Sequence, residues 1–283
     1  MAQFTNQAQL AYGNSVTNSN IAVGEILEVL SAAKTAVRSS YAQNDTVTYI
    51  VSVVNSGTLP FSGVVLTDDL GAYTFGTASL TPLTYVADTA RYYVNGVLQT
   101  TPAVTAGSPL VISGITIPAG GNATIIYEAE TNQYAPLTLG SVITNTAVLS
   151  GTGVTPVSVS AEVSIESEPL LSITKSVSPV PVSENGTLTY TFVIQNNGNE
   201  AADAADAAVI TDVFDPLLSN LTVTFNGTVW TEGVHYNYDE TTGTFTTVAG
   251  QVTVPAATFT QDAATGIWLT TPGVSTLVIS GTV

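Results

Sequence analysis

The sequence predicts an all-β protein that contains two tandem β-sandwiches, the second of them incomplete. Of its 283 residues, 45% are hydrophobic and only 9% are charged, so the chain can bury two cores of ordinary domain size. Thr, Val, Gly and Asn dominate, and no long stretch has helical periodicity. Short alternating strands between Gly, Asn and Pro turns are typical of an immunoglobulin-like sandwich.

The composition also excludes several classes of partner. The net charge is −17, so a phosphate backbone would be repelled; the only basic residues are Lys34, Arg38, Arg91 and Lys175. No apolar run reaches the roughly 18 residues that a membrane span needs. The start of the chain lacks the basic and apolar segments of a secretory signal, so the signal has been removed or export takes another route. Without cysteine, neither disulfides nor thiolate metal sites can form.

An internal repeat divides the chain. A spacing of 141 residues separates matching positions of two units: Lys34 and Lys175, Tyr49 and Tyr190, Gly57 and Gly198. The next matching segments, residues 65–68 and 209–212, are 144 apart, so the second unit carries a short insert, expected to be a loop over residues 201–208. Asn95-Gly96 and Asn226-Gly227 predict tight hairpin turns.

The two units end differently. After a late strand at residues 124–127, the first unit continues through residues 142–149 and 157–165, whereas the second stops soon after the matching strand, 276–279. Similar closing strands occur only at the start of the chain, over residues 4–12 and 16–26. We therefore expect donor strands over residues 1–26, a complete repeat over 27–168 and an incomplete acceptor repeat over 169–283. Folding back onto the chain's own second unit would require a reversal over a short linker and is disfavoured.

Three polar residues of each unit share strand faces with apolar ones. They come from an early, a middle and a late strand, and the only two lysines of the chain occupy the same early position. Because burying unpaired charges is costly, these groups should meet. The two sets are Lys34, Asp68 and Asn145 in the first unit, and Lys175 and Asp212 with Asn6 for the second.

This constellation resembles the intramolecular isopeptide sites of Gram-positive pilins and adhesins. The resemblance implies that a buried Lys amine attacks an Asn side-chain amide, that a carboxylic acid shuttles the proton, and that ammonia leaves. Burial, which lowers the pKa of an amine and raises that of an acid, would leave both neutral and reactive. The units also resemble domain of unknown function 11, a repeat module of bacterial and archaeal surface proteins. The shared pattern is Lys, Thr-Tyr-x-x-x-x-x-Asn-x-Gly, Val-x-x-Thr-Asp and Thr-Asn-x-Ala.

Carried onto this chain, the resemblance implies a bond from Lys34 to Asn145 with Asp68 as proton shuttle. The second unit supplies Lys175 and Asp212, and its Asn would be Asn6 of the next molecule. The alternative is a buried Lys–Asp salt bridge with the Asn as a hydrogen-bond partner.

These observations predict a structural subunit of an extracellular fibre on a cell or spore surface. Identical subunits would join head to tail by strand donation, a contact that does not close into a ring. Four side chains would fill the acceptor groove: Phe4, Ala8, Leu10 and Tyr12. The alternative is an adhesin module that binds carbohydrate or a host protein. No cofactor and no enzymatic activity beyond the self-made bond are expected, and any surface anchor is unidentified.

Two weaker signals concern metals and catalysis. His235 is the only histidine, without a second His or Cys beside it, and is expected to be structural. An acidic cluster could offer oxygen ligands to calcium but lacks the regular calcium-loop spacing, so no metal site is expected. Its members are Glu200, Asp203, Asp206 and Asp215.

Overall fold

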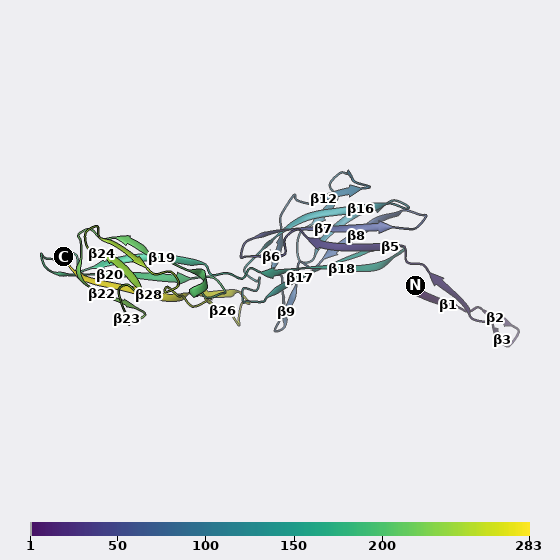
Figure 1. The fold of residues 1–283 in the computed structure, drawn as a ribbon. Helices are drawn as coiled ribbons and strands as arrows, with labels where there is room; N and C mark the ends of the chain where they lie inside the picture. Colours follow the sequence, from purple (N-terminus) through teal and green to yellow (C-terminus); the bar gives the residue numbers. More distant parts are fainter. Residues whose placement is uncertain (1) are drawn as a thin grey trace. The chain divides into compact units, whose positions relative to one another are not determined.

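The protein has an all-β fold, as predicted (Figure 1). The computed structural model describes residues 2–283, and the one helical element in that range is a short 3-10 turn, η1 (Ala204–Asp206). Two compact units are present. The first comprises residues up to Asn132 together with Ile143–Val163, and the second comprises Gln133–Val142 and Ser164–Val283. Across residues 2–283, no helix is long and apolar enough to cross a membrane.

The first unit contains two six-stranded sheets. One sheet has the order β13-β12-β16-β7-β5, with β11 also paired to β16. Alternate residues of β7 point into the core, among them the fully buried Val47, Tyr49 and Val51. The strands of this sheet are β5 (Leu30–Ala36), β7 (Thr46–Asn55), β11 (Leu83–Tyr85), β12 (Arg91–Val94), β13 (Val97–Leu98) and β16 (Asn122–Thr131).

The other sheet of this unit has the order β14-β15-β8-β17-β18-β6. Strand β8 lies between β15 and β17, so both of its edges are paired, and Ala147 of β17 lies opposite Asp68 of β8. The strands are β6 (Ser40–Tyr41), β8 (Phe61–Asp68), β14 (Ala103–Thr105), β15 (Leu110–Ile117), β17 (Val142–Gly151) and β18 (Val154–Ile165); β9 (Tyr73–Phe75) and β10 (Ala78–Leu80) form a small separate hairpin.

The second unit repeats only part of this plan. A five-stranded sheet has the order β19-β20-β28-β22-β23, and a three-stranded sheet has the order β21-β25-β24. The core between them is rich in aromatic residues, including Phe192, Phe214 and Phe245. The strands are β19 (Leu171–Ser178), β20 (Thr187–Asn196), β21 (Thr211–Val213), β22 (Ser219–Phe225), β23 (Thr228–Trp230), β24 (Tyr236–Asp239), β25 (Thr244–Thr247) and β28 (Gly273–Thr282); β26 (Thr258–Gln261) and β27 (Trp268–Thr271) form a hairpin.

The local turns follow the sequence closely. Asn95 and Gly96 have φ of 48° and 78°, and Asn226 and Gly227 have φ of 49° and 80°. Positive φ at both central residues is the geometry of a tight hairpin turn, as predicted. The insert at residues 201–208 is irregular apart from η1 and one isolated bridge from Ala202 to Val254.

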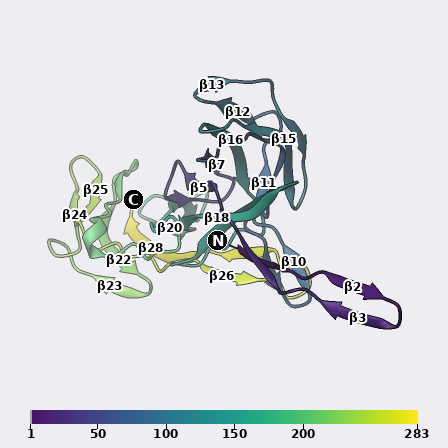
Figure 2. The same ribbon diagram turned by 90° about the vertical axis from the view of Figure 1, so that its right-hand side faces the viewer.

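The start of the chain forms a long two-stranded hairpin (Figures 1 and 2). Strand β1 (Ala2–Asn6) pairs with β4 (Ala22–Ile26), and β2 (Gln9–Tyr12) pairs with β3 (Ser15–Asn18). Ser19 bridges the two pairs, because its hydroxyl accepts from Ala8 N at 2.9 Å and its N–H donates to Ala8 O at 2.8 Å. Residues 3–28 are exposed apart from the half-buried Gly24, so in the single chain this hairpin has no core of its own.

Candidate functional site

Lys34 and Asp68 form a buried ion pair in the first unit. Lys34 lies on β5, where strand alternation turns it into the sandwich, and Asp68 is the last residue of β8. Lys34 Nζ lies 2.6 Å from Asp68 Oδ2, and both side chains are fully buried. The two strands belong to opposite sheets, so the pair spans the core.

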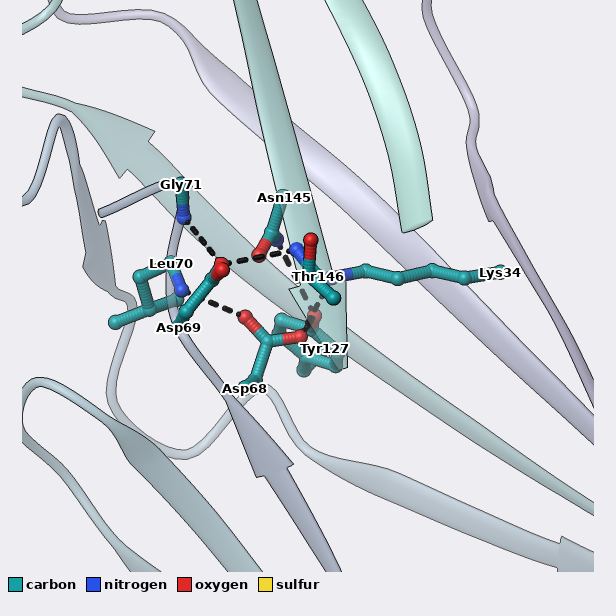
Figure 3. A network of polar contacts seen from close by, with 8 residues as sticks. All are labelled: Lys34, Asp68, Asp69, Leu70, Gly71, Tyr127, Asn145 and Thr146. Carbon is teal, nitrogen blue, oxygen red and sulfur yellow. Dashed lines mark hydrogen bonds and ion pairs between the residues drawn. The ribbon is translucent and has the colours of Figure 1, made fainter. Parts of the chain in front are cut away.

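Asp68 is held by two further donors (Figure 3). Its Oδ1 accepts a hydrogen bond of 3.0 Å from Leu70 N, at the start of the turn that follows β8. Its Oδ2, which faces the lysine, also accepts a short hydrogen bond from the Tyr127 hydroxyl on β16. All of these donors belong to the first unit, so its own strands and turn hold the carboxylate in place.

Asn145 completes the cluster from β17, and Figure 3 shows its amide turned toward Tyr127 and the Lys34 amine. Its side chain is fully buried, with Nδ2 at 3.4 Å from the Tyr127 hydroxyl. Its Oδ1 has no hydrogen-bond partner among the described residues. A buried amide oxygen without a donor is uncommon, and it lies where charge would develop if the amide carbon were attacked.

Asp69 fixes the strand that carries Asn145. Its Oδ1 accepts from Thr146 N at 2.9 Å and from Gly71 N at 2.8 Å, and its own N–H donates to Thr146 O at 2.9 Å. These bonds tie the end of β8 to the residue next to Asn145. The amide is therefore positioned by backbone contacts rather than by a flexible loop.

The cluster is buried, and the pKa values of two of its members shift accordingly. Burial lowers the pKa of Lys34, and the neighbouring Asp68 opposes that shift. Burial also raises the pKa of Tyr127 well above its ordinary value, with the Asp68 charge adding to the effect. The Lys34 amine lies 4.9 Å from the centre of the Tyr49 ring, which stacks on Tyr127 with 5.6 Å between centroids. Burial thus favours a neutral amine and a neutral phenol beside the Asn145 amide.

The second unit repeats the Lys–Asp pair in a much more open setting. Lys175 on β19 and Asp212 on β21 form a short ion pair, but 37% of the Lys175 side chain and 18% of the Asp212 side chain are exposed. The amine lies over aromatic rings, 4.4 Å from the centre of Tyr190 and 5.3 Å from that of Phe214. No Asn of this unit takes the place that Asn145 has in the first unit, as far as the described residues show.

The reason for this exposure is an unpaired strand edge. Among the described residues, β21 pairs with β25 alone, whereas its counterpart β8 is flanked by β15 and β17. All eight residues of β19 are exposed, including Leu171 and Ile173. A cavity of about 180 Å³ opens between β19 and the segment leading into β21, lined by Leu171, Ile173, Ile194, Val209, Ile210 and Val252.

The N-terminal hairpin resembles β17 and β18 of the first unit in its layout. In β17 and β18 the two-residue turn is Thr152-Gly153, and in the hairpin it is Gly13-Asn14. Asn145 and Asn6 each precede their turn by the same seven residues. Phe4, Leu10 and Tyr12, which share a strand face with Asn6, are 52%, 62% and 62% exposed.

The weaker sequence signals gain nothing in the structure. His235 Nδ1 accepts from Thr231 N at 3.0 Å, and its ring stacks on Trp230, which gives it a structural role. Asp203 and Asp206 cap η1, and Glu200 accepts a hydrogen bond from Ser167. Within residues 2–283 no group of three or more His, Cys, Asp or Glu side chains could hold a metal ion.

Sequence reasoning missed two members of the first cluster. Tyr127 aligns with Ile279 within the late strands of the two units, and the difference between a phenol and an aliphatic side chain is the signal that singles it out. Asp69 follows Asp68 directly, and its counterpart is Val213, so the same comparison could have singled it out.

Comparisons with known proteins find likeness at the level of structure alone. The pilus backbone RrgB from Streptococcus pneumoniae aligns over 86% of this chain and 55% of its own, with 11% identity and a TM-score of 0.35. BcpA, the major pilin subunit of Bacillus cereus, aligns over 96% and 73%, with 11% identity and a TM-score of 0.37. The major pilin SpaD from Corynebacterium diphtheriae aligns over 86% and 59%, with 12% identity and a TM-score of 0.36.

This chain therefore spans only 55% of the length of RrgB and 59% of that of SpaD. No protein-family model matches the chain, so the resemblance of its repeats to domain of unknown function 11 remains a prediction. No curated protein matches it either.

Proposed function

We propose that this protein is the structural subunit of an extracellular fibre and that it polymerises head to tail by donating its N-terminal hairpin. The hairpin of one molecule, residues 1–26, would complete the second unit of its neighbour. The observation that carries the proposal is the unpaired edge of β21 beside an open apolar cavity, in a chain whose other end carries an exposed hairpin of matching layout.

The first unit supplies a template for the docked state. There, Ala147 and Leu149 of β17 lie opposite Asp68 and Leu66 of β8. Because Asn6 corresponds to Asn145, the same register would set Ala8 opposite Asp212 and Leu10 opposite Ile210. Leu10 would then enter the cavity that Ile210 helps to line.

Docking by this route would satisfy two needs together. Main-chain hydrogen bonds along β21 would pair an edge that is otherwise open, and the apolar face of the hairpin would leave water. Fully burying a side chain such as leucine contributes roughly 1.5–3 kcal/mol, so Phe4, Leu10 and Tyr12 together supply a substantial driving force. The donor and acceptor surfaces differ, so each addition leaves a free acceptor and a free donor, and a filament grows.

The proposal includes two amide bonds, each between the lysine of a Lys–Asp pair and an asparagine side chain. In the first unit, the neutral Lys34 amine would attack Cγ of Asn145, with Asp68 carrying the proton and ammonia leaving. In the second unit, Lys175 would react in the same way with Asn6 of the incoming subunit, assisted by Asp212. The support is the burial of the first cluster and its contacts, which place Lys34 on Asp68 and Asn145 on Tyr127, the phenol that also bonds to Asp68.

A truncation tests strand donation directly. A chain lacking residues 1–26 keeps the acceptor unit but has no hairpin to donate. We expect it to stay monomeric and, when mixed with the full chain, to shorten filaments in proportion to its share, because it ends growth at the hairpin side. Filaments of normal length from the truncated chain alone, seen by electron microscopy, would contradict the proposal.

A further inference from the structure

We propose that Tyr127 is a catalytic residue of the first cluster, relaying a proton from Asp68 to the departing nitrogen of Asn145. The inference rests on the proposed Lys34–Asn145 bond. It supplies a route for the proton from Asp68 to the leaving nitrogen of Asn145, two groups that make no direct hydrogen bond among the described residues. The Tyr127 hydroxyl lies between the carboxylate and the amide (Figure 3).

The contacts form one continuous chain from the nucleophile to the leaving group. Lys34 Nζ donates to Asp68 Oδ2 at 2.6 Å, and the Tyr127 hydroxyl donates to the same oxygen. Asn145 Nδ2 in turn donates to the Tyr127 oxygen at 3.4 Å. No direct hydrogen bond joins Asp68 to Asn145 Nδ2 among the described residues, so the phenol is the one group that touches both.

The reaction balances through this chain. The neutral Lys34 nitrogen bonds to Cγ of Asn145, the C=O π pair moves to Oδ1, and the lysine nitrogen passes one proton to Asp68 Oδ2. As the C–N bond breaks and Oδ1 returns its electron pair, Asp68 gives that proton to the Tyr127 oxygen while Tyr127 gives its own to the leaving nitrogen. The products are a secondary amide and ammonia, and both Asp68 and Tyr127 end in the protonation states in which they began.

Two features suit Tyr127 to this step. Burial keeps its phenol neutral, so a proton is always present to donate. Its ring is held by stacking on Tyr49, which fixes the hydroxyl between its two partners. The second unit lacks this group, because Ile279 takes the place of Tyr127 opposite Tyr190. The phenol would thus relay a proton only for the bond made within one chain and not for the bond made between chains.

The test compares two tyrosines that lose only a hydroxyl. Full chains with Tyr127→Phe or Tyr49→Phe are recovered unfolded from inclusion bodies and refolded by dilution. Refolding is carried out at a pH low enough that cross-linking, rather than folding, limits the rate. Samples are quenched over time, and intact mass reports the loss of ammonia. Tyr49→Phe is the matched control, since its hydroxyl is buried beside Asn145 in the same cluster but makes no hydrogen bond to Asp68 among the described residues.

We expect Tyr127→Phe to slow the appearance of the cross-linked mass by about 10²-fold or more, the usual contribution of a proton-transfer group, while Tyr49→Phe stays near the wild-type rate. Fluorinated tyrosines placed at position 127 should change the rate in step with their acidity, which a packing role would not do. Equal rates for Tyr127→Phe and wild type, equal slowing by both variants, or a rate independent of phenol acidity would each overturn the assignment. A wild-type chain that never loses ammonia would instead reject the proposed bond itself.

Discussion

Lys34 and Lys175 hold the same position in two successive units, yet the Lys34 side chain is fully buried and the Lys175 side chain is 37% exposed. Both amines face an aspartate and lie over a tyrosine ring. The difference comes from β17, which covers the first pair and has no counterpart over the second pair among the described residues.

The first prediction concerns the accessibility of the two lysines. In the monomeric chain lacking residues 1–26, an amine-reactive reagent should modify Lys175 and leave Lys34 untouched, because only the former reaches solvent. In filaments of the full chain, the reagent should modify neither lysine. Peptide mass mapping reads the outcome directly, since these are the only lysines in the chain. Labelling of Lys175 in filaments as fast as in monomers would argue against hairpin docking over it.

A second prediction separates the covalent bond from a salt bridge in the first unit. The intact mass of the wild-type chain should fall short of the sequence mass by one ammonia, and Lys34→Ala or Asn145→Ala should restore it. Lys34→Ala should also destabilise the unit by roughly 3–5 kcal/mol, because it leaves the Asp68 charge buried without its cation. A wild-type mass equal to that of the sequence would leave only the ion pair.

The third prediction concerns bonds between subunits. Lys175→Ala should abolish oligomer ladders that survive boiling in denaturant, while filaments held by strand pairing still form. Asn6→Ala should give the same result from the donor side. Lys34→Ala is the matched control and should keep its ladder, because its amine serves only the bond within one chain. Ladders that persist in Lys175→Ala would require another source of covalent linkage.

A fourth prediction uses the two faces of the hairpin. Leu10→Asp should weaken assembly by at least about tenfold, because a charged side chain would enter the apolar cavity and the burial of leucine would be lost. Val16→Asp is the control. Val16 is 59% exposed, close to the 62% of Leu10, but it points to the opposite face of the hairpin. Equal loss of filaments in both variants, by electron microscopy or sedimentation, would contradict the predicted docking face.

The fifth prediction concerns pH. Burial raises the pKa of Tyr41, Tyr49 and Tyr127 above the ordinary value of 10.0. These phenols stay protonated in the folded first unit when they would ionise in the unfolded chain. The contribution of these phenols to the free energy of unfolding is complete below pH 10.0. It is lost as the pH rises above 10.0, at up to about 1.4 kcal/mol per pH unit for each phenol.

Unfolding of the first unit, followed by circular dichroism between about pH 8 and about pH 11, should show this decline. Tyr49→Phe should make the decline shallower. A stability that is flat or rising above pH 10.0 would contradict the burial of these phenols.

Much of the fold follows from strand alternation. It assigned the inward faces of β5, β8 and β17, and with them the set of Lys34, Asp68 and Asn145, because the side-chain direction in a strand depends only on parity. The repeat spacing likewise identified Lys175 and Asp212 as the second pair.

Other features depend on three-dimensional proximity that no local pattern encodes. Tyr127 reaches Asp68 from the opposite sheet, so its role depends on how the two sheets face each other. The clamp from Asp69 to Thr146 requires the register between β8 and β17. The pairing of the N-terminal strands with one another follows from the two-residue turn at Gly13-Asn14 and is seen only in the structure.

The placement of Lys34 and Asn145 has a mechanical consequence. Lys34 lies on β5, the first strand after the hairpin, and Asn145 lies on β17, the last strand but one before the chain leaves this sandwich. If the proposed bond joins these side chains, a pull along the proposed fibre would pass from one to the other through a single amide. The strands between them would bear little of the tension, so a stretched filament could hold its length without unravelling its sheets.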